Sequence, residues 1–415
     1  MKRILTVLLA ALLVLSSAAC GNGENTVNNE IFPKKTEMKT DGQLYTGGEV
    51  KFPAALWETP TAERYDALDR EALNVEGYFI DSVQGTKVFA FVGLPEGASA
   101  ENPVPGIVLV HGGGGTAFFE WVSFWVKRGY AAIAMDTDGN MPTENSRMTN
   151  SDHTASIREH GPANMGFADW QKPVEEQWAY HAIASVIVCN SFLRSLEGVD
   201  GGRIGITGIS YGSFLTCQAA AYDDRFCFAA PVYGALGILE PWCNYGRVFS
   251  ANERANELWN TTEIIRASRT PMLFVCGSND TFIPLAAIAR SAAAAKYGNI
   301  LIIQGYPHSH AHGSDVEEIF VFADSICKGA AGLTHLAEER EGGFSFDLPD
   351  GVSLEDVTGW YVSAESVDCN STWLPVSGDA DGSLASAVFP ESAAYTYVTV
   401  TDSRGYRITT PMKAL

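Results

Sequence analysis

The distribution of hydrophobic and polar positions changes character twice along the chain. Residues 77–83 and 87–92 form two β-rich runs, and Gln84-Gly85 between them predicts a hairpin. From residue 105 onward, short apolar runs alternate with segments of helical character, which predicts a mostly parallel sheet flanked by helices. The predicted strands are 105–110, 130–135, 203–207, 227–232, 272–276 and 300–304, and the predicted helices are 117–127, 173–196, 215–222, 286–296 and 314–328.

Local features support two of these helix starts. Pro173 suits the first turn of the long helix, where its missing N–H is not needed. Ser314 and Glu317 have the spacing of a capping box, which predicts that the last helix begins there. Between the elements, the polar, Gly- and Asn-rich residues 136–170 predict a long loop that shapes a site.

The irregular segment 235–269 follows a predicted strand at a position where a lid could be inserted. It contains three large aromatic residues, Trp242, Tyr245 and Trp259. Stacking on a sugar ring is one role for such residues, and packing of the lid is the role we expect. Trp178, Tyr180 and His181 on the long helix are likewise expected to pack against the sheet.

The pattern changes again beyond Thr334, where no helix is predicted. Short β-like runs at 344–346, 359–363, 372–376, 385–389 and 395–400 are separated by Gly, Asp, Pro and Ser. We therefore divide the chain into residues 1–20, a signal peptide; 21–50, a flexible tether; 51–335, the α/β domain; and 340–415, a small all-β domain resembling a sandwich.

The N-terminus has the organisation of an export signal. Lys2 and Arg3 precede an apolar stretch at 4–15, and small residues at 16–19 lead to Cys20. This arrangement resembles a bacterial lipoprotein signal, which implies lipidation of Cys20 and attachment to the outer face of a bacterial membrane. The alternative is an ordinary cleaved signal peptide, and both interpretations predict export.

Composition limits the remaining functions. The 415 residues carry a formal net charge of −21, which argues against a nucleic-acid partner and against electrostatic binding to anionic lipid. Hydrophobic residues make up 46% of the chain, enough for a sizeable core, and no internal apolar stretch reaches transmembrane length. The cysteines after Cys20 are irregularly spaced and suggest no zinc site, and their pairing is left open.

The most informative stretch runs from Arg203 to Gly212. A short β-rich run ends in Gly208-Ile209-Ser210-Tyr211-Gly212, and a helical segment follows. Strand, sharp Gly-x-Ser-x-Gly turn and helix in this order form a nucleophile elbow, in which the serine is strained and exposed to substrate. The alternative is a Gly/Ser turn of a nucleotide-binding fold.

Partners for Ser210 should follow later strands. Asp280 follows the strand at 272–276 and is the predicted acid, whereas Asp223 and Asp224 end the elbow helix, remote from the strand tips. Three histidines follow the next strand, at positions 308, 310 and 312. We predict His308 as the base from its distance behind the strand, with His310 as the alternative.

An upstream glycine run supplies the remaining part of such a site. His111 precedes four glycines, and the N–H of Gly112 or Gly113, together with that of Tyr211, is predicted to bind an oxyanion. A phosphate-binding loop is the alternative, but the Gly-Lys-[Ser/Thr] ending is missing. His111 is expected to brace this loop.

These motifs resemble those of the α/β-hydrolase superfamily. The order Ser210, Asp280, His308 behind a His-Gly-Gly-Gly-Gly loop is similar to bacterial acetyl xylan esterase-like, dienelactone hydrolase-like and prolyl-oligopeptidase-like hydrolases, over about residues 75–330. The resemblance implies an α/β-hydrolase fold with a serine–histidine–aspartate site, no cofactor and no metal.

We therefore expect an exported serine carboxylesterase acting on acylated carbohydrates or small esters. The alternatives are a prolyl-oligopeptidase-like peptidase and an inactive hydrolase fold that serves as a surface binding module. The residues from about Gly342 onward contain no catalytic candidate, so we expect a chain ending near Leu333 to keep chemical activity if it folds. The acyl group, the alcohol and the oligomeric state are left open.

Overall fold

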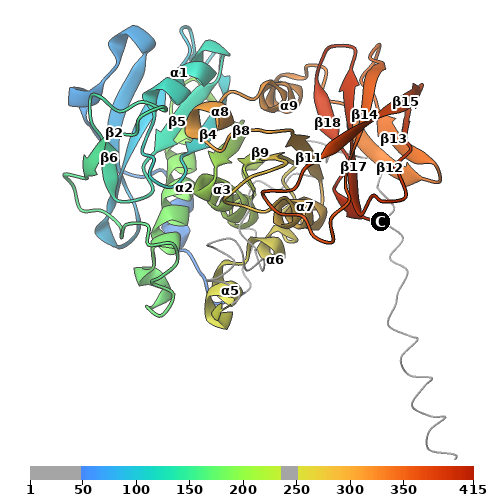
Figure 1. Cartoon of the computed structure of the whole chain (residues 1–415). Helices are drawn as coiled ribbons and strands as arrows, with labels where there is room; N and C mark the ends of the chain where they lie inside the picture. The colour runs from blue at the N-terminus through green and yellow to red at the C-terminus, as the bar shows by residue number, and fades with distance from the viewer. Residues whose placement is uncertain (1–47, 235–250) are drawn as a thin grey trace, which may run out of the picture. The chain divides into compact units, whose positions relative to one another are not determined.

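The structure, a computed structural model, describes residues 48–234 and 251–415 (Figure 1). The predictions for the signal peptide, for Cys20 and for most of the tether lie outside the described residues. So do Trp242 and Tyr245 of the proposed lid. In the part of the chain that is described, no helix has both the length and the apolar character needed to span a bilayer.

A twisted sheet forms the centre of the α/β part. Its neighbouring strands run in the order β1, β2, β3, β5, β4, β8, β9, β10 and β11. The pairs from β5 to β11 are parallel, whereas β1, β2 and β3 pair antiparallel at one edge. The bounds are β1 Ala62–Arg64, β2 Val75–Asp81, β3 Lys87–Gly93, β4 Val104–Val110, β5 Ala131–Met135, β8 Val199–Ile209, β9 Phe226–Val232, β10 Met272–Gly277 and β11 Gly298–Ile303.

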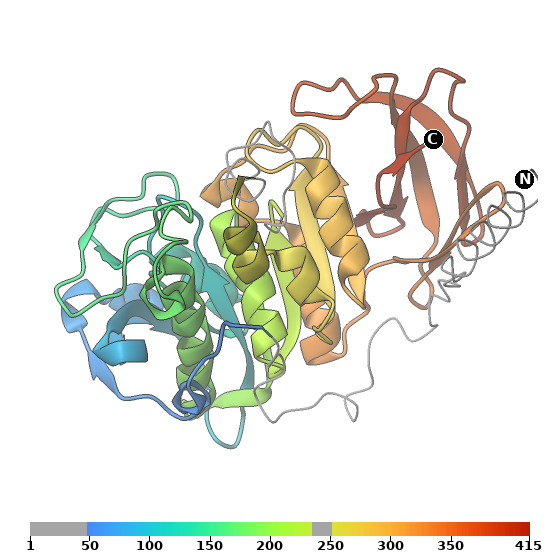
Figure 2. The ribbon, with the colours of Figure 1, turned by 90° about the horizontal axis from the view of Figure 1, so that it is seen from below.

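Helices cover both faces of this sheet. On one face α2 (Trp178–Ser195), α3 (Tyr211–Tyr222) and α7 (Leu285–Ala294) lie along the strands, as Figure 2 shows. On the other face α1 (Phe119–Lys127) and α9 (Glu317–Lys328) build a second core. Strands such as β4 and β10 are therefore buried on both sides, which explains their continuous apolar sequences. Shorter helices are α5 (Glu253–Trp259), α6 (Thr261–Ile265) and α8 (His310–Gly313).

Most predicted elements are present, but the two helix starts that local sequence features supported both differ from the prediction. The long helix begins at Trp178, because Pro173 precedes a separate 3₁₀ turn and Gln177 lies between the two. The Gln177 amide donates to the Lys172 carbonyl and accepts from the Trp259 indole, which keeps this residue out of the helix. The indole of Trp259 is buried, in agreement with a packing role.

The predicted capping box of the last helix is wrong. Helix α9 begins at Glu317, its N-cap is Val316, and no side chain caps it. The Ser314 hydroxyl donates instead to the Ala311 carbonyl at 3.0 Å, because Ser314 ends the short helix α8, which the sequence analysis missed. A local motif was thus overridden by the preceding turn.

The C-terminal residues form an additional β region. Strands β12, β13, β16, β15, β14, β17 and β18 pair in that order, all antiparallel, and β19 also pairs with β17. Their bounds are β12 His335–Arg340, β13 Gly343–Asp347, β14 Leu354–Val362, β15 Leu374–Asp381, β16 Leu384–Ala387, β17 Tyr395–Asp402, β18 Arg407–Thr409 and β19 Lys413–Ala414. Strand β18 also pairs antiparallel with β11, so it continues the central sheet.

The polar loop after β5 contains a small two-stranded sheet, β6 (Asn140–Pro142) and β7 (His153–Ala155). Asp136 begins this loop as a turn former, because its carboxylate accepts the N–H groups of Asp138 and Asn140. The sulfurs of Cys227 and Cys327 lie 3.6 Å apart in the core, a distance too long for a disulfide bond.

Candidate active site

Ser210 lies at the turn between β8 and α3 in a strained conformation. Its φ of 58° and ψ of −114° are unusual for a residue with a side chain. The flanking glycines permit the turn, since a Cβ at Gly208 would lie 2.2 Å from the Gly212 carbonyl oxygen. A Cβ at Gly212 would lie 2.1 Å from the carbonyl oxygen of Val110, at the end of β4. The strand–turn–helix geometry predicted for Gly-x-Ser-x-Gly is therefore present.

Asp280 and His308 lie on adjacent loops and are in contact. They follow the neighbouring parallel strands β10 and β11, whose carboxyl ends share one edge of the sheet. His308 Nδ1 lies 2.7 Å from Asp280 Oδ2, and the carboxylate is fully buried. The other oxygen, Oδ1, accepts the N–H groups of Phe282 at 2.8 Å and Ile283 at 3.0 Å. The carboxylate is thus held on one side by backbone and on the other by imidazole.

Tyr233 links His308 to the serine turn. The Ser210 N–H donates to the Val232 carbonyl at 2.9 Å, and the next residue, Tyr233, stacks its ring on His308 with centroids 4.3 Å apart. The Tyr233 hydroxyl donates to the Pro307 carbonyl at 2.6 Å, and burial raises its pKa to about 12. The sequence analysis missed Tyr233, although its position directly behind β9 places it at the same sheet edge as the other residues.

His310 has a different environment from His308. Its Nε2 accepts the Gly112 N–H at 3.0 Å, so the neutral ring carries its proton on Nδ1. Burial and the neighbouring His111 and His308 lower the pKa of His310 to about 4. The third candidate, His312, is exposed and binds the Ser309 hydroxyl through Nδ1.

Two imidazoles hold the glycine loop that follows β4. His111 is buried, its Nδ1 lies 2.8 Å from the Gly112 carbonyl, and its Nε2 accepts the Thr137 N–H at 3.0 Å. The ring is therefore a neutral Nδ1–H tautomer that donates to the loop. A Cβ at Gly115 would lie 2.8 Å from both His111 Nδ1 and His310 Nε2, so only glycine leaves room for both rings. The bracing role expected of His111 matches these contacts.

The predicted oxyanion donors lie against the serine. Tyr211 is the first residue of α3, where the helix dipole favours negative charge. A Cβ on Gly112 would lie 3.0 Å from Ser210 Cβ, and one on Gly113 would lie 2.9 Å from the Tyr211 ring. The Gly112 N–H is already bonded to His310, which favours Gly113 as the loop donor.

A metal centre and a cavity are two other kinds of ligand site. Within residues 48–234 and 251–415, no group of three or more His, Cys, Asp or Glu side chains is arranged to hold a metal ion.

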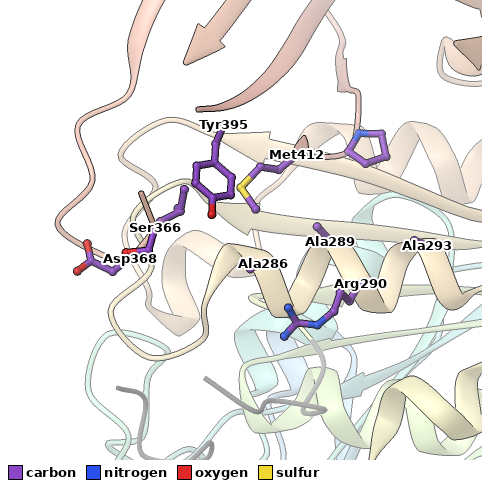
Figure 3. A pocket seen from close by; sticks show the side chains of 10 residues that line it. Ala286, Ala289, Arg290, Ala293, Ser366, Asp368, Tyr395 and Met412 are labelled. Atoms are coloured by element: carbon purple, nitrogen blue, oxygen red, sulfur yellow. The ribbon is translucent and has the colours of Figure 1, made fainter. Parts of the chain in front are cut away.

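A cavity of about 640 Å³ lies between α7 and the C-terminal strands, and Figure 3 shows the side chains that line it. Ala286 and Arg290 form its α7 side, and Asp368, Tyr395 and Met412 face them. None of the candidate catalytic residues lines it.

Comparisons with known proteins identify the fold. A model of the prolyl oligopeptidase family matches residues 154–318. Among solved structures, the acetyl xylan esterase from Paenibacillus sp. R4 is similar with a TM-score of 0.50 and 18% identity, over 66% of this chain and 91% of that one. The chain has the α/β-hydrolase fold. The fold class predicted from the sequence, with a C-terminal β region, is thereby confirmed.

Other solved structures are similar to this chain at lower scores. Acetyl xylan esterase 1 from Thermoanaerobacterium sp. JW/SL YS485 has a TM-score of 0.46 and 18% identity, over 60% of this chain and 82% of that one. A puromycin-hydrolyzing peptidase of Mycobacterium tuberculosis has a TM-score of 0.46 and 20% identity, over 66% of this chain and 40% of that one. No curated protein matches the sequence at a significant level.

Proposed function

We propose that this α/β-hydrolase is a serine carboxylesterase that acts on acylated carbohydrates or small esters. The observation that carries the proposal is the combination of a strained Ser210 with the His308–Asp280 pair at the same sheet edge. A serine nucleophile needs a base, and the base needs a group that holds its tautomer. With Nδ1 committed to Asp280, Nε2 of His308 is the nitrogen that accepts the serine proton.

The reaction proceeds in two halves. Ser210 Oγ attacks the ester carbonyl while His308 takes its proton, and the protonated imidazole then donates that proton to the leaving alcohol. In the second half, water gives a proton to His308 and attacks the acyl-enzyme, and collapse releases the acid and returns the proton to Ser210. Asp280 stabilises the imidazolium in both halves. No cofactor is required.

The oxyanion of each tetrahedral intermediate is placed at the N-terminus of α3. Donation by the Tyr211 and Gly113 N–H groups would stabilise the developing charge, and each such donor is worth about 10²–10³-fold in kcat. His308, rather than His310, is proposed as the base because Nε2 of His310 is occupied by the Gly112 N–H.

Peptidase activity is the second candidate, because the matching family model is that of the prolyl oligopeptidases. Labelling with a fluorophosphonate probe tests for the serine nucleophile, with Ser210→Ala as the matched control. Turnover of acetylated sugars and small acetyl esters is then compared with turnover of aminoacyl amides. Higher kcat/KM on the esters supports the esterase, whereas preferential amide cleavage would assign the site to a peptidase. Absence of labelling and of turnover would favour the inactive binding module.

We further propose that the mature chain is anchored to the outer face of a bacterial membrane through a lipid on Cys20. The support is the arrangement of Lys2, Arg3 and the apolar stretch before a cysteine. Metabolic labelling with a fatty-acid analogue should mark the wild-type chain, and Cys20→Ser should remove the label and the membrane association. An unlabelled, wholly soluble wild type would refute the anchor.

A further inference from the structure

The residue before the proposed catalytic acid is bonded to the C-terminal β region. The side-chain nitrogen of Asn279 donates to the Ser371 carbonyl at 2.6 Å and to the Cys369 carbonyl at 3.3 Å. Asp280 follows directly in the sequence. A chain segment about 90 residues further on thus holds the loop that carries the acid.

The acceptor carbonyls belong to a compact turn. The Ser371 N–H donates to the Asp368 carbonyl at 3.2 Å, and the Asp368 N–H donates to the Ser371 hydroxyl at 2.9 Å. These bonds hold the turn in one conformation. The Cys369 and Ser371 carbonyls are therefore already oriented to accept from Asn279, and no loop entropy is lost when the bonds form. Asp368, labelled in Figure 3, is also part of the wall of the cavity beside α7.

A second connection reaches the loop of the proposed base. The Gln304 amide donates to the Tyr397 hydroxyl of β17 and accepts from the Ser278 hydroxyl at 3.0 Å. Gln304 immediately follows β11, and His308 lies in the same loop. The Ser278 hydroxyl also lies 2.7 Å from Asn279 Oδ1, so the two connections meet between the acid loop and the base loop.

Two of the four groups at this meeting point, Ser278 and Tyr397, are buried, whereas Asn279 and Gln304 are half-buried. Ser278 is 1% exposed and Tyr397 is 2% exposed. Burial raises the pKa of Tyr397, so its hydroxyl stays protonated. Loss of the Tyr397 hydroxyl therefore removes an acceptor on the buried side of Gln304, where a replacement partner is harder to find than at the surface.

The pairing of β10 with β11 fixes where the two loops begin, since Gly277 lies opposite Ile303. The Phe282 and Ile283 N–H groups hold Asp280 relative to its own loop. The Ser278 N–H donates to the Ile303 carbonyl at 3.0 Å, and Gln304 and Asn279 then extend this link to the C-terminal strands.

We propose that the C-terminal β region positions the acid and base loops of the hydrolase, through Asn279 and Gln304. The role rests on the proposed function, because Asp280 and His308 are the groups that are positioned. Asn279, Gln304 and Tyr397 are positioning residues that do not touch the substrate. Displacement of Asp280 from His308 lowers kcat by weakening the stabilisation of the imidazolium, and it leaves the binding of a small ester nearly unchanged.

The test compares Tyr397→Phe and Asn279→Ala with the wild type on 4-nitrophenyl acetate, in the full-length chain. Tyr395→Phe is the matched control, since its hydroxyl lies on the same strand but donates to the Glu365 carbonyl. We expect kcat to fall on the order of tenfold in the two test variants with little change in KM. We also expect the acidic limb of the pH–kcat profile to move to lower pH, because His308 loses carboxylate stabilisation.

Combination with Asp280→Asn separates positioning from general destabilisation. In that background, Tyr397→Phe should cost little more, because both changes act through the same carboxylate. Wild-type kcat and pH profile in both test variants, or an equal loss in the Asp280→Asn background, would overturn the proposal. Ser210→Ala is measured alongside: if it keeps full turnover, the proposed function fails and the positioning role fails with it. If Ser210→Ala is inactive and the test variants are unaffected, only the positioning role fails.

Discussion

At the residue scale, two histidines of one loop use their nitrogens for different tasks. His308 offers Nδ1 to Asp280, whereas His310 offers Nε2 to the Gly112 N–H. We therefore expect His308→Ala to match Ser210→Ala, each costing on the order of 10⁴-fold or more in kcat. The double variant should cost little beyond either single one, because nucleophile and base act as one unit.

His310→Ala should have a smaller effect. Its loss releases the Gly112 N–H and loosens the glycine loop, which predicts a decrease in kcat of about ten- to hundredfold. His312→Ala, at an exposed position, serves as the control and should remain close to wild type. Steady-state kinetics on a small ester measure all variants. An inactive His310→Ala beside an active His308→Ala would assign the base to His310.

The lowered pKa of His310 also predicts acid sensitivity of the fold. Its pKa of about 4 lies below the ordinary 6.5, so the folded state favours the neutral ring, chiefly because burial disfavours the charged one. The resulting stability is present above pH 6.5 and is lost as the pH falls towards 4. At about 1.4 kcal/mol per pKa unit, the loss is on the order of 3 kcal/mol.

Urea unfolding between pH 7 and pH 4 measures this effect. His310→Gln keeps an acceptor near the Gly112 N–H and cannot titrate, so it should lose less free energy of unfolding than the wild type. His335, whose pKa burial also lowers to about 4, titrates in both proteins and does not affect the difference. Parallel pH dependence of wild type and variant would contradict the prediction.

At this scale, the sequence indicated which residues lie at one edge of the sheet better than it indicated the contacts between them. Ser210, Asp280 and His308 follow strands, and parallel strands bring their carboxyl ends to one edge, so loop order alone indicated them. The bond between Gly112 and His310 joins residues 198 positions apart, and no local pattern contains that information. Tyr233 was missed because an aromatic residue behind a strand is usually interpreted as packing.

At the element scale, the serine turn depends on close backbone approach. Gly212→Ala would place a Cβ 2.1 Å from the Val110 carbonyl oxygen, and Gly208→Ala would place one 2.2 Å from the Gly212 carbonyl oxygen. Backbone atoms cannot move aside as flexible side chains do. We expect each change to lower the free energy of unfolding by about 3 kcal/mol or more, as measured by thermal unfolding.

Gly201→Ala, in the same strand β8, is the matched control. A Cβ there would lie 3.4 Å from the end of the Arg194 side chain, which is an ordinary contact. It should leave the melting temperature nearly unchanged. Equal stability of the Gly201 and Gly212 variants would mean that the turn can relax without cost.

Element starts were less predictable than element order. Pro173 and Ser314 carry local helix-start features, yet the helices begin at Trp178 and Glu317. In both cases the side chain bonds to the preceding turn in place of the helix start. The Gln177 amide donates to the Lys172 carbonyl, and the Ser314 hydroxyl donates to the Ala311 carbonyl at the end of α8. Apolar periodicity remains valid through such shifts, because it reports which face is buried.

At the scale of the whole molecule, the sequence predicted the C-terminal β region from its short strands. It did not predict how this region is attached to the central sheet. Strand β18 pairs with β11 through Thr409, whose hydroxyl donates to the Ile300 carbonyl at 2.9 Å and accepts the Ile302 N–H at 3.2 Å. Arg407 bonds the buried Glu318 of α9 at 2.8 Å. Edge pairing of this kind depends on which strand is left unpaired, and the sequence of neither partner specifies it.

These contacts lead to a more specific prediction for a chain ending near Leu333, which the sequence analysis expected to keep chemical activity if it folds. Truncation at Leu333 removes β18, which exposes the edge of β11, and it removes Arg407, which leaves the buried Glu318 carboxylate without its ion-pair partner. Asn279 and Gln304 lose their acceptors as well. We expect the truncated chain to melt at a lower temperature and to aggregate more readily, and its soluble fraction to show a reduced kcat.

Thr409→Val in the full-length chain separates two causes of the reduced kcat, which are loss of the β18–β11 contact and loss of the bonds to Asn279 and Gln304. It removes only the hydroxyl between β18 and β11, so it should lower the melting temperature modestly and leave kcat unchanged. If kcat per soluble molecule of the truncated chain equals that of the wild type, the C-terminal β region stabilises the sheet edge and has no part in the site. If kcat falls in the truncated chain while Thr409→Val retains it, the decrease reflects lost positioning of Asp280 and His308, since loss of the edge contact alone leaves turnover intact.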